Sequence, residues 1–120
     1  MLKGKLFIDG SLVYEGEWKD NVPNGWGVYY FDQAKYEGEI LNGTINGKGT
    51  FYLLSGKNKG DRYEGEFSGD DFNGHGTYYF FNGDKYEGDF LNGKRNGHGK
   101  FTSIDGNIQE GLWAEDVFMD

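Results

Sequence analysis

The chain contains no cysteine and only one proline among its 120 residues. The lack of cysteine excludes disulfides and thiol chemistry, which suits a reducing compartment. No apolar run is long enough for a signal peptide or a membrane span. Aliphatic side chains are sparse, so a core of interlocked leucine and isoleucine is not expected. These absences predict a cytoplasmic protein whose core is built from another kind of side chain.

Positive charge is also in short supply. Lysine and arginine number 12 against 20 acidic residues, which gives a net charge of -8. Nucleic acids and anionic lipid surfaces need a basic footprint, so we expect no nucleic acid partner and at most weak membrane association. The local basic concentrations have turn solvation as their simplest explanation: Lys57, Lys59, Arg62, Lys94 and Arg95.

Glycine and aromatic residues are what the chain has in abundance, with 22 glycines and 18% aromatics. They recur as Tyr-Glu-Gly-acidic-aromatic or isoleucine, followed in each full copy by Gly-x-Gly. A fixed period in the low twenties is typical of stacked repeats, which bury their apolar faces only together. The full copies begin at Tyr14, Tyr36, Tyr63 and Tyr86, and a faded copy begins at Gln109.

Each repeat reads as two short strands, because its residues alternate with period two and no segment shows helical periodicity. Turn residues join the strands, which predicts an antiparallel meander. The opening tyrosines are 22, 27 and 23 residues apart, and we expect residues 57–60 to lengthen one hairpin by two residues on each arm. One register then holds throughout: Leu6 with Tyr14, Tyr29 with Tyr36, Phe51 with Tyr63, Tyr78 with Tyr86 and Phe101 with Gln109.

This register separates the residues chemically. One face collects rings and glycines, and the glycines leave space for rings to lie against the backbone. The other face collects acidic pairs, such as Glu15 and Glu17, opposite basic residues. We expect cross-strand charge pairs there, for example Lys5 with Glu15 and His75 with Asp89, each stabilising by about 0.2–1 kcal/mol.

The pattern from Tyr14 to Trp113, Tyr-Glu-Gly-Glu-Trp followed by a turn and Gly-x-Gly-x-Tyr, resembles the MORN (membrane occupation and recognition nexus) repeat. The resemblance implies an all-β fold: an elongated, twisted, single-layer antiparallel meander of stacked β-hairpins with a groove. It also implies a scaffold, a partner-binding module or an accessory domain, with lipid binding proposed for some members. Ile40 and Gln109 depart from the pattern, where it has an aromatic residue and a tyrosine.

We predict one domain over residues 1–120. It comprises a half repeat (1–13), four repeats (14–35, 36–62, 63–85 and 86–108), and a terminal half repeat with a cap (109–120). The apolar residues Val117, Phe118 and Met119 lie outside the repeat pattern. We expect this tail to fold back as a short turn of helix that caps the last hairpin. The alternative is a homodimer through the C-terminal edge.

No catalytic, metal or cofactor residues are predicted. The acidic pairs recur in every repeat on an open face, whereas acid–base catalysis needs two carboxylates in different environments. His75 and His98 occupy equivalent positions about 10 Å apart, too far to share a zinc ion at about 2.1 Å. Gly-x-Gly alone is not a dinucleotide fingerprint, because no helix follows.

A single-layer sheet has no second layer to cover its aromatic face, and large exposed apolar patches mark interaction sites. We therefore predict a non-enzymatic scaffold that binds a protein or peptide, for example an amphipathic helix, in an aromatic–glycine groove. The alternatives are a peripheral module for anionic phospholipid membranes and an accessory domain of a larger enzyme. The predicted groove residues are Tyr14, Trp18, Tyr36, Tyr63, Phe67, Tyr78, Tyr86 and Phe90.

Overall fold

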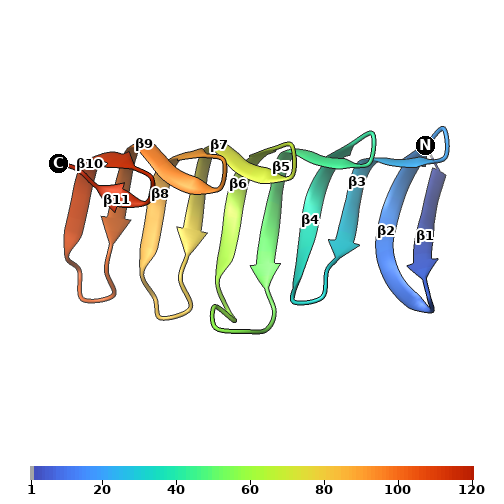
Figure 1. The fold of residues 1–120 in the computed structure, drawn as a ribbon, viewed down its shortest axis with the longest axis horizontal. Helices are drawn as coiled ribbons and strands as arrows, with labels where there is room; N and C mark the ends of the chain where they lie inside the picture. Colours follow the sequence, from blue (N-terminus) through green and yellow to red (C-terminus); the bar gives the residue numbers. More distant parts are fainter. Residues whose placement is uncertain (1) are drawn as a thin grey trace.

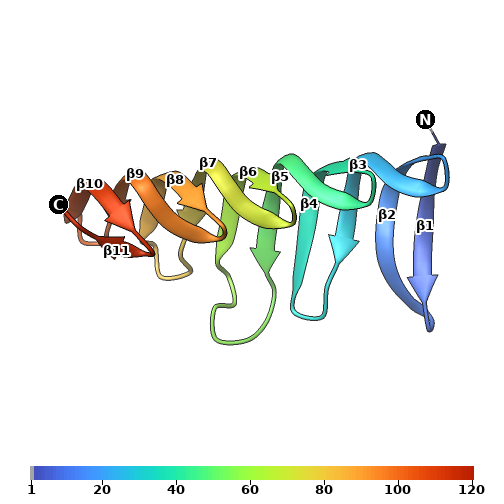
Figure 2. The ribbon, with the colours of Figure 1, turned by 45° about the horizontal axis from the view of Figure 1, so that its top comes forward.

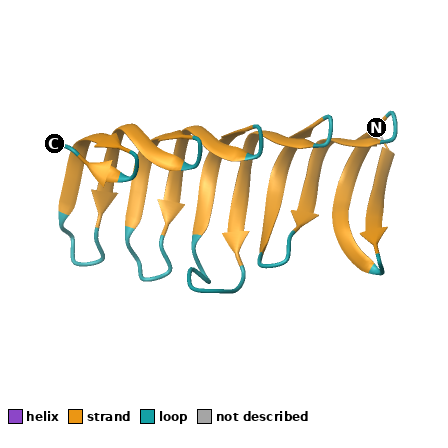
Figure 3. Ribbon diagram, in the orientation of Figure 1, coloured by secondary structure: helices purple, strands orange, loops and turns teal. Residues whose placement is uncertain are grey.

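The computed structural model, which describes residues 2–120, is one open sheet of eleven antiparallel strands in chain order (Figures 1 and 3). This confirms the all-β meander. The long axis measures 47 Å and the others 25 and 18 Å. The strands are β1 (Leu2–Ile8), β2 (Ser11–Lys19), β3 (Val22–Tyr30), β4 (Ala34–Leu41), β5 (Thr44–Leu53), β6 (Arg62–Ser68), β7 (Asp71–Tyr79), β8 (Lys85–Leu91), β9 (Lys94–Thr102), β10 (Ile108–Ala114) and β11 (Val117–Phe118).

The predicted register is confirmed in all five hairpins, from Leu6 opposite Tyr14 to Phe101 opposite Gln109. The expectation of longer arms around residues 57–60 was wrong. β5 ends at Leu53 and β6 begins at Arg62, so the extra residues enlarge the turn. Backbone hydrogen bonds close that turn, since Leu53 donates its N–H to the carbonyl of residue 61 and accepts the N–H of residue 60.

The sheet bends in the four strand pairs β2–β3, β4–β5, β6–β7 and β8–β9, where the first strand carries the glycine of Tyr-Glu-Gly. The ladder between β2 and β3 shifts after Gly16, and the same shift recurs in β4, β6 and β8. The bulged backbone includes Gly25, whose φ of 108° favours glycine. Beyond the bulges the strand ends curl forward above the sheet (Figure 2). We call the turns at these curled ends the tips.

The second acidic residue of each copy holds this bulge. The Glu17 carboxylate accepts the Trp26 backbone N–H at 2.6 Å, and Glu66 accepts that of His75 at 2.6 Å. This corrects the expectation that both acids of each pair serve cross-strand ion pairs. Two of the expected cross-strand pairs are present, since Lys5 lies 3.9 Å from Glu15 and His75 lies 3.6 Å from Asp89. The acidic motif therefore shapes the backbone as well as the surface.

Four repeat tyrosines are the largest fully buried side chains of the core, and each is 0% exposed: Tyr14, Tyr36, Tyr63 and Tyr86. Each hydroxyl donates to the backbone carbonyl three residues further on, at 2.7–3.0 Å. Each ring lies over the second glycine of the following Gly-x-Gly, where a Cβ atom would overlap the ring. The predicted packing of rings on glycines is confirmed.

Neighbouring tips are joined by backbone hydrogen bonds of 2.8–3.1 Å, which continue the order of the sheet along its curled rim. The tail continues this arrangement. It folds back as β11, with Trp113 opposite Phe118, and Met119 donates its N–H to the Leu112 carbonyl at 2.8 Å. The expected cap is present, but it is a strand rather than a turn of helix, because the open edge of β10 offers it backbone partners.

Candidate functional site: an aromatic groove under the tips

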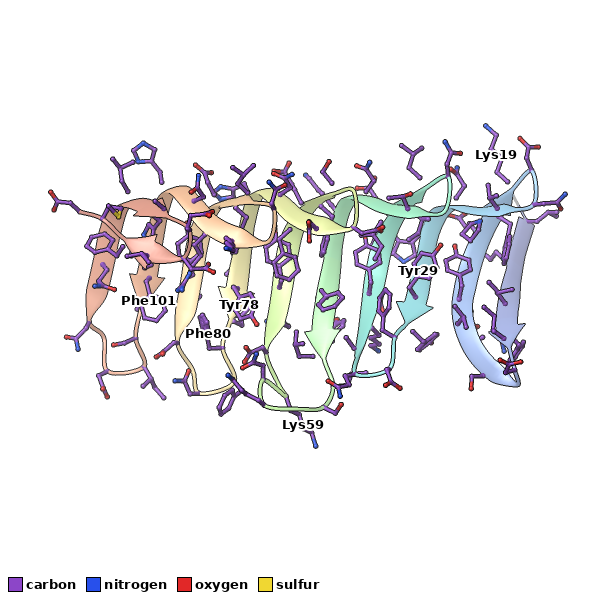
Figure 4. All side chains as sticks on the ribbon, in the orientation of Figure 1. Lys19, Tyr29, Lys59, Tyr78, Phe80 and Phe101 are labelled. Carbon is purple, nitrogen blue, oxygen red and sulfur yellow. The ribbon has the colours of Figure 1, made fainter. Side chains whose placement is uncertain are left out.

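A continuous row of rings lies below the tips on the inner side of the bend. We call this surface the groove, and Figure 4 labels four of its rings. Neighbouring ring centroids are 4.7–6.2 Å apart, within the range of favourable aromatic contacts. The row runs through Tyr29, Phe31, Phe51, Phe72, Tyr78, Phe80 and Phe101.

The groove deepens into a first pocket of about 400 Å³ beneath the tip between β4 and β5. The Tyr29 hydroxyl donates to the Gly43 carbonyl at 2.7 Å and ties the sheet to the tip. Burial and the nearby Asp70 carboxylate raise the pKa of Tyr29, so its hydroxyl remains a donor. Phe31 is 49% exposed at the mouth. The pocket is lined by Tyr29, Phe31, Gly43, Ile45, Phe51 and Asp70.

A second pocket of about 250 Å³ lies beneath the tip between β8 and β9. The Tyr78 hydroxyl donates to the buried carboxylate of Asp61 at 2.7 Å. Burial, followed by this hydrogen bond, raises the pKa of Tyr78 well above its usual range. Asp61 also accepts the Phe81 N–H at 2.7 Å, so it joins two neighbouring turns. The lining residues are Phe72, Tyr78, Phe80, Phe90, Gly93, Arg95 and Asp116.

Arg95 gives the second pocket its charge. Its guanidinium lies 5.0–6.0 Å from the centroids of four rings, within reach of cation–π attraction. The Asp116 carboxylate accepts hydrogen bonds from the Nε and from the backbone N–H of Arg95. The pair therefore fixes the cap against β9 and places a compensated charge in an aromatic surrounding.

A scan against family models matches the MORN repeat at residues 14–33, 36–56, 63–85 and 86–108. These segments open on the four buried tyrosines and cover well over half of the chain. The chain belongs to the MORN repeat family. MORN repeats are generally involved in protein or membrane binding, and the family is a binding module rather than a catalytic one. No curated protein matches the chain.

Most of the predicted groove residues lie beneath the groove rather than on it. The four MORN tyrosines are 0% exposed, while Phe67 and Phe90 are 3% and 5% exposed. The expectation of direct contact with a partner is therefore corrected for the four tyrosines and Phe67, which support the groove from below, whereas Phe90 still lines the second pocket. Only Trp18 and Tyr78 of the predicted set are partly exposed.

The accessible rings come from the second strand of each MORN repeat and from the turn after it. Tyr29 and Phe51 share a face with the buried tyrosines, so alternation alone does not show which of them reaches solvent. Phe31 and Phe80 follow two residues after the last ring of this face and were not among the predicted groove residues. Both residues could have been found from the sequence, because the alternation of side chains between the two faces continues past the end of the strand.

The basic residues are not gathered on one surface. Figure 4 places Lys19 at a tip and Lys59 at a turn on the opposite rim, and Lys94 and Arg95 are paired with Glu115 and Asp116. No helix among residues 2–120 has the length and apolar character to cross a bilayer. In the same part of the chain, no three histidine or acidic residues are grouped to hold a metal ion.

Proposed function

We propose that this chain is a non-enzymatic interaction module that binds an amphipathic helix of a protein partner in the groove. The observation that carries this proposal is the unbroken row of rings from Tyr29 to Phe101, which no second layer formed by residues 2–120 covers. A single-layer sheet leaves such a face to a partner, since contiguous apolar patches on soluble proteins mark contact sites.

The dimensions of the groove support a helical occupant. Tyr29 lies on β3 and Phe101 on β9, so the row crosses six strand spacings, about 29 Å at about 4.8 Å each. A helix of about 19 residues has this length. Its apolar face would lie on the rings, and its polar face would remain in water.

The rings are held in place before a partner arrives, which favours binding. The Tyr29 and Tyr78 hydroxyls are both engaged in hydrogen bonds of 2.7 Å. Their χ angles are therefore restrained in the free protein, and less side-chain entropy is lost on association. The basic residues on opposite rims offer no comparable surface to an anionic membrane.

The experiment is a selection of helical 19-residue peptides from a displayed library, followed by binding measurements on two matched variants. Phe31→Glu places a charge in the first pocket, whereas Trp26→Glu changes a ring of similar exposure (53% against 49%) outside that pocket. We expect Phe31→Glu to weaken the selected peptides at least tenfold and Trp26→Glu to leave them unchanged.

The proposal is rejected if the selection yields no peptide that depends on Phe31. It is also rejected if the chain floats with phosphatidylserine vesicles at low salt and Phe31→Glu leaves that binding unchanged. That result would favour a membrane module instead, because binding would then depend on charge rather than on the rings.

A further inference from the structure

The two pockets are the same site repeated at a distance of two MORN units. Tyr29 and Phe31 line the first, and Tyr78 and Phe80 line the second at equivalent positions. The corresponding strands, β3 and β7, are four strand spacings apart. At about 4.8 Å per spacing, the pockets are separated by about 19 Å.

The tip sequences explain why the groove deepens at these two places. Both tips are Asn-Gly turns, and Gly43 and Gly93 have φ values of 83° and 86°. A residue without a side chain suits this left-handed conformation and leaves the space below it open.

The tip between the two pockets is built differently. Asp70 stands where the tips above the two pockets have glycine, and its carboxylate accepts the Ile45 N–H at 2.8 Å. Phe72 stacks on the buried Tyr63 at 4.0 Å with an interplanar angle of 11°. Asp70 and Phe72 thus form the boundary between the two pockets, since Asp70 lines the first and Phe72 the second.

Charge differs between the two sides of the groove at its middle. The tip between the two pockets carries the exposed residues Asp70 and Asp71. The Asp71 carboxylate reaches toward the neighbouring tip, 3.7 Å from where a Cβ of Gly93 would lie. Lys57 and Lys59 belong to the turn on the opposite rim. A helix in the groove thus meets the negative charge of Asp70 and Asp71 near its middle, on the side that faces the tips.

We propose that the partner helix carries two bulky apolar side chains at positions i and i+14, and lysine or arginine on the flank facing the tips. Fourteen residues rise about 21 Å and return to about the same helix face, which matches the spacing of the pockets. The carboxylates of Asp70 and Asp71 attract the basic flank and so favour one rotation of the helix about its long axis. This inference rests on the proposed function, because it specifies the occupant of the same groove.

The test uses two synthetic 22-residue peptides of identical composition in an alanine–lysine helical host. One has tryptophan at positions 4 and 18, and the other at positions 4 and 11, so both pairs share a helix face but only the first spans the pockets. Fluorescence anisotropy should show at least tenfold tighter binding of the first peptide. Phe31→Glu and Phe80→Glu should each remove this advantage, and Trp26→Glu should retain it, with folding of each variant checked by circular dichroism.

Charge is tested in the same assay with Asp71→Lys, an exposed substitution outside both pocket linings. This substitution should weaken binding of the lysine-flanked peptide several-fold and strengthen binding of a glutamate-flanked version. Added salt should reduce both changes in affinity. Equal affinity of the two spacings, with Phe31 still required, overturns the two-anchor inference but keeps the groove function. If neither peptide depends on Phe31 and the library also yields no groove binder, the proposed function itself fails.

Discussion

Gly76→Ala is the substitution that most directly tests how this sheet is held together. A Cβ atom at position 76 would overlap the ring and hydroxyl of Tyr63. The Tyr63 ring has no free space to move into. It stacks on Phe72 and makes an edge contact with Phe90 at 4.9 Å.

The magnitude follows from what the ring loses when it is displaced. Overpacking a core by a methyl group costs about 1–3 kcal/mol. The hydrogen bond from the Tyr63 hydroxyl to the Glu66 carbonyl, 2.8 Å long, contributes about 1 kcal/mol more. We expect Gly76→Ala to lower the free energy of unfolding by about 3 kcal/mol, or Tm by roughly 10 °C.

Urea and thermal denaturation followed by circular dichroism measure this change. Thr77→Val is the control, since Thr77 is the next residue on β7 and its side chain lies on the other face; it should be nearly neutral. In a Tyr63→Leu background, Gly76→Ala should lower the free energy of unfolding much less, because the ring and hydroxyl atoms that the new Cβ would overlap are absent. Equal costs in both backgrounds, or equal effects of Gly76→Ala and Thr77→Val, would refute the packing of rings on glycines.

Three further predictions concern other contacts. Asp61→Ala should lower the free energy of unfolding by about 2 kcal/mol, because it leaves the Tyr78 hydroxyl and the Phe81 N–H without their partner. Asp32→Ala, at an exposed turn, should leave the free energy of unfolding unchanged in the same urea titration. Burial raises the pKa of Tyr14 and Tyr86 to about 12 from 10.0. The contribution of these two tyrosines to the free energy of unfolding is therefore complete below pH 10. It is lost between pH 10 and 12, by up to about 1.4 kcal/mol per pH unit for each tyrosine. Tyrosinate absorbance at 295 nm should rise together with unfolding, whereas full ionisation of a still-folded protein would contradict this. Deleting residues 117–120 uncovers the edge of β10 and should produce association in light scattering; a deletion product that remains monomeric up to millimolar concentration would show that the cap does not protect this edge.

The sequence alone determined the architecture and the register. Alternation of side chains fixes which residues share a face, and unequal repeat lengths leave only one register that keeps Tyr78 opposite Tyr86 and Phe51 opposite Tyr63. The sequence also predicted that glycine is required beneath each tyrosine, because the ring occupies the space that a Cβ atom would need. Such properties are local or concern neighbouring strands, and short-range patterns record them.

Only the tertiary structure decided which rings are available to a partner. Tyr14 and Tyr29 lie on the same face of paired strands, yet only Tyr14 is fully buried, because the bend at the bulge folds the tips over one part of each hairpin. The bend itself depends on a carboxylate, such as that of Glu17, reaching a backbone N–H nine residues away. The depth of the groove also depends on contacts between repeats, such as Asp70 with Ile45, 25 residues apart. Alternation carries no information about how far a sheet bends or what its neighbours cover, since both follow from packing in three dimensions.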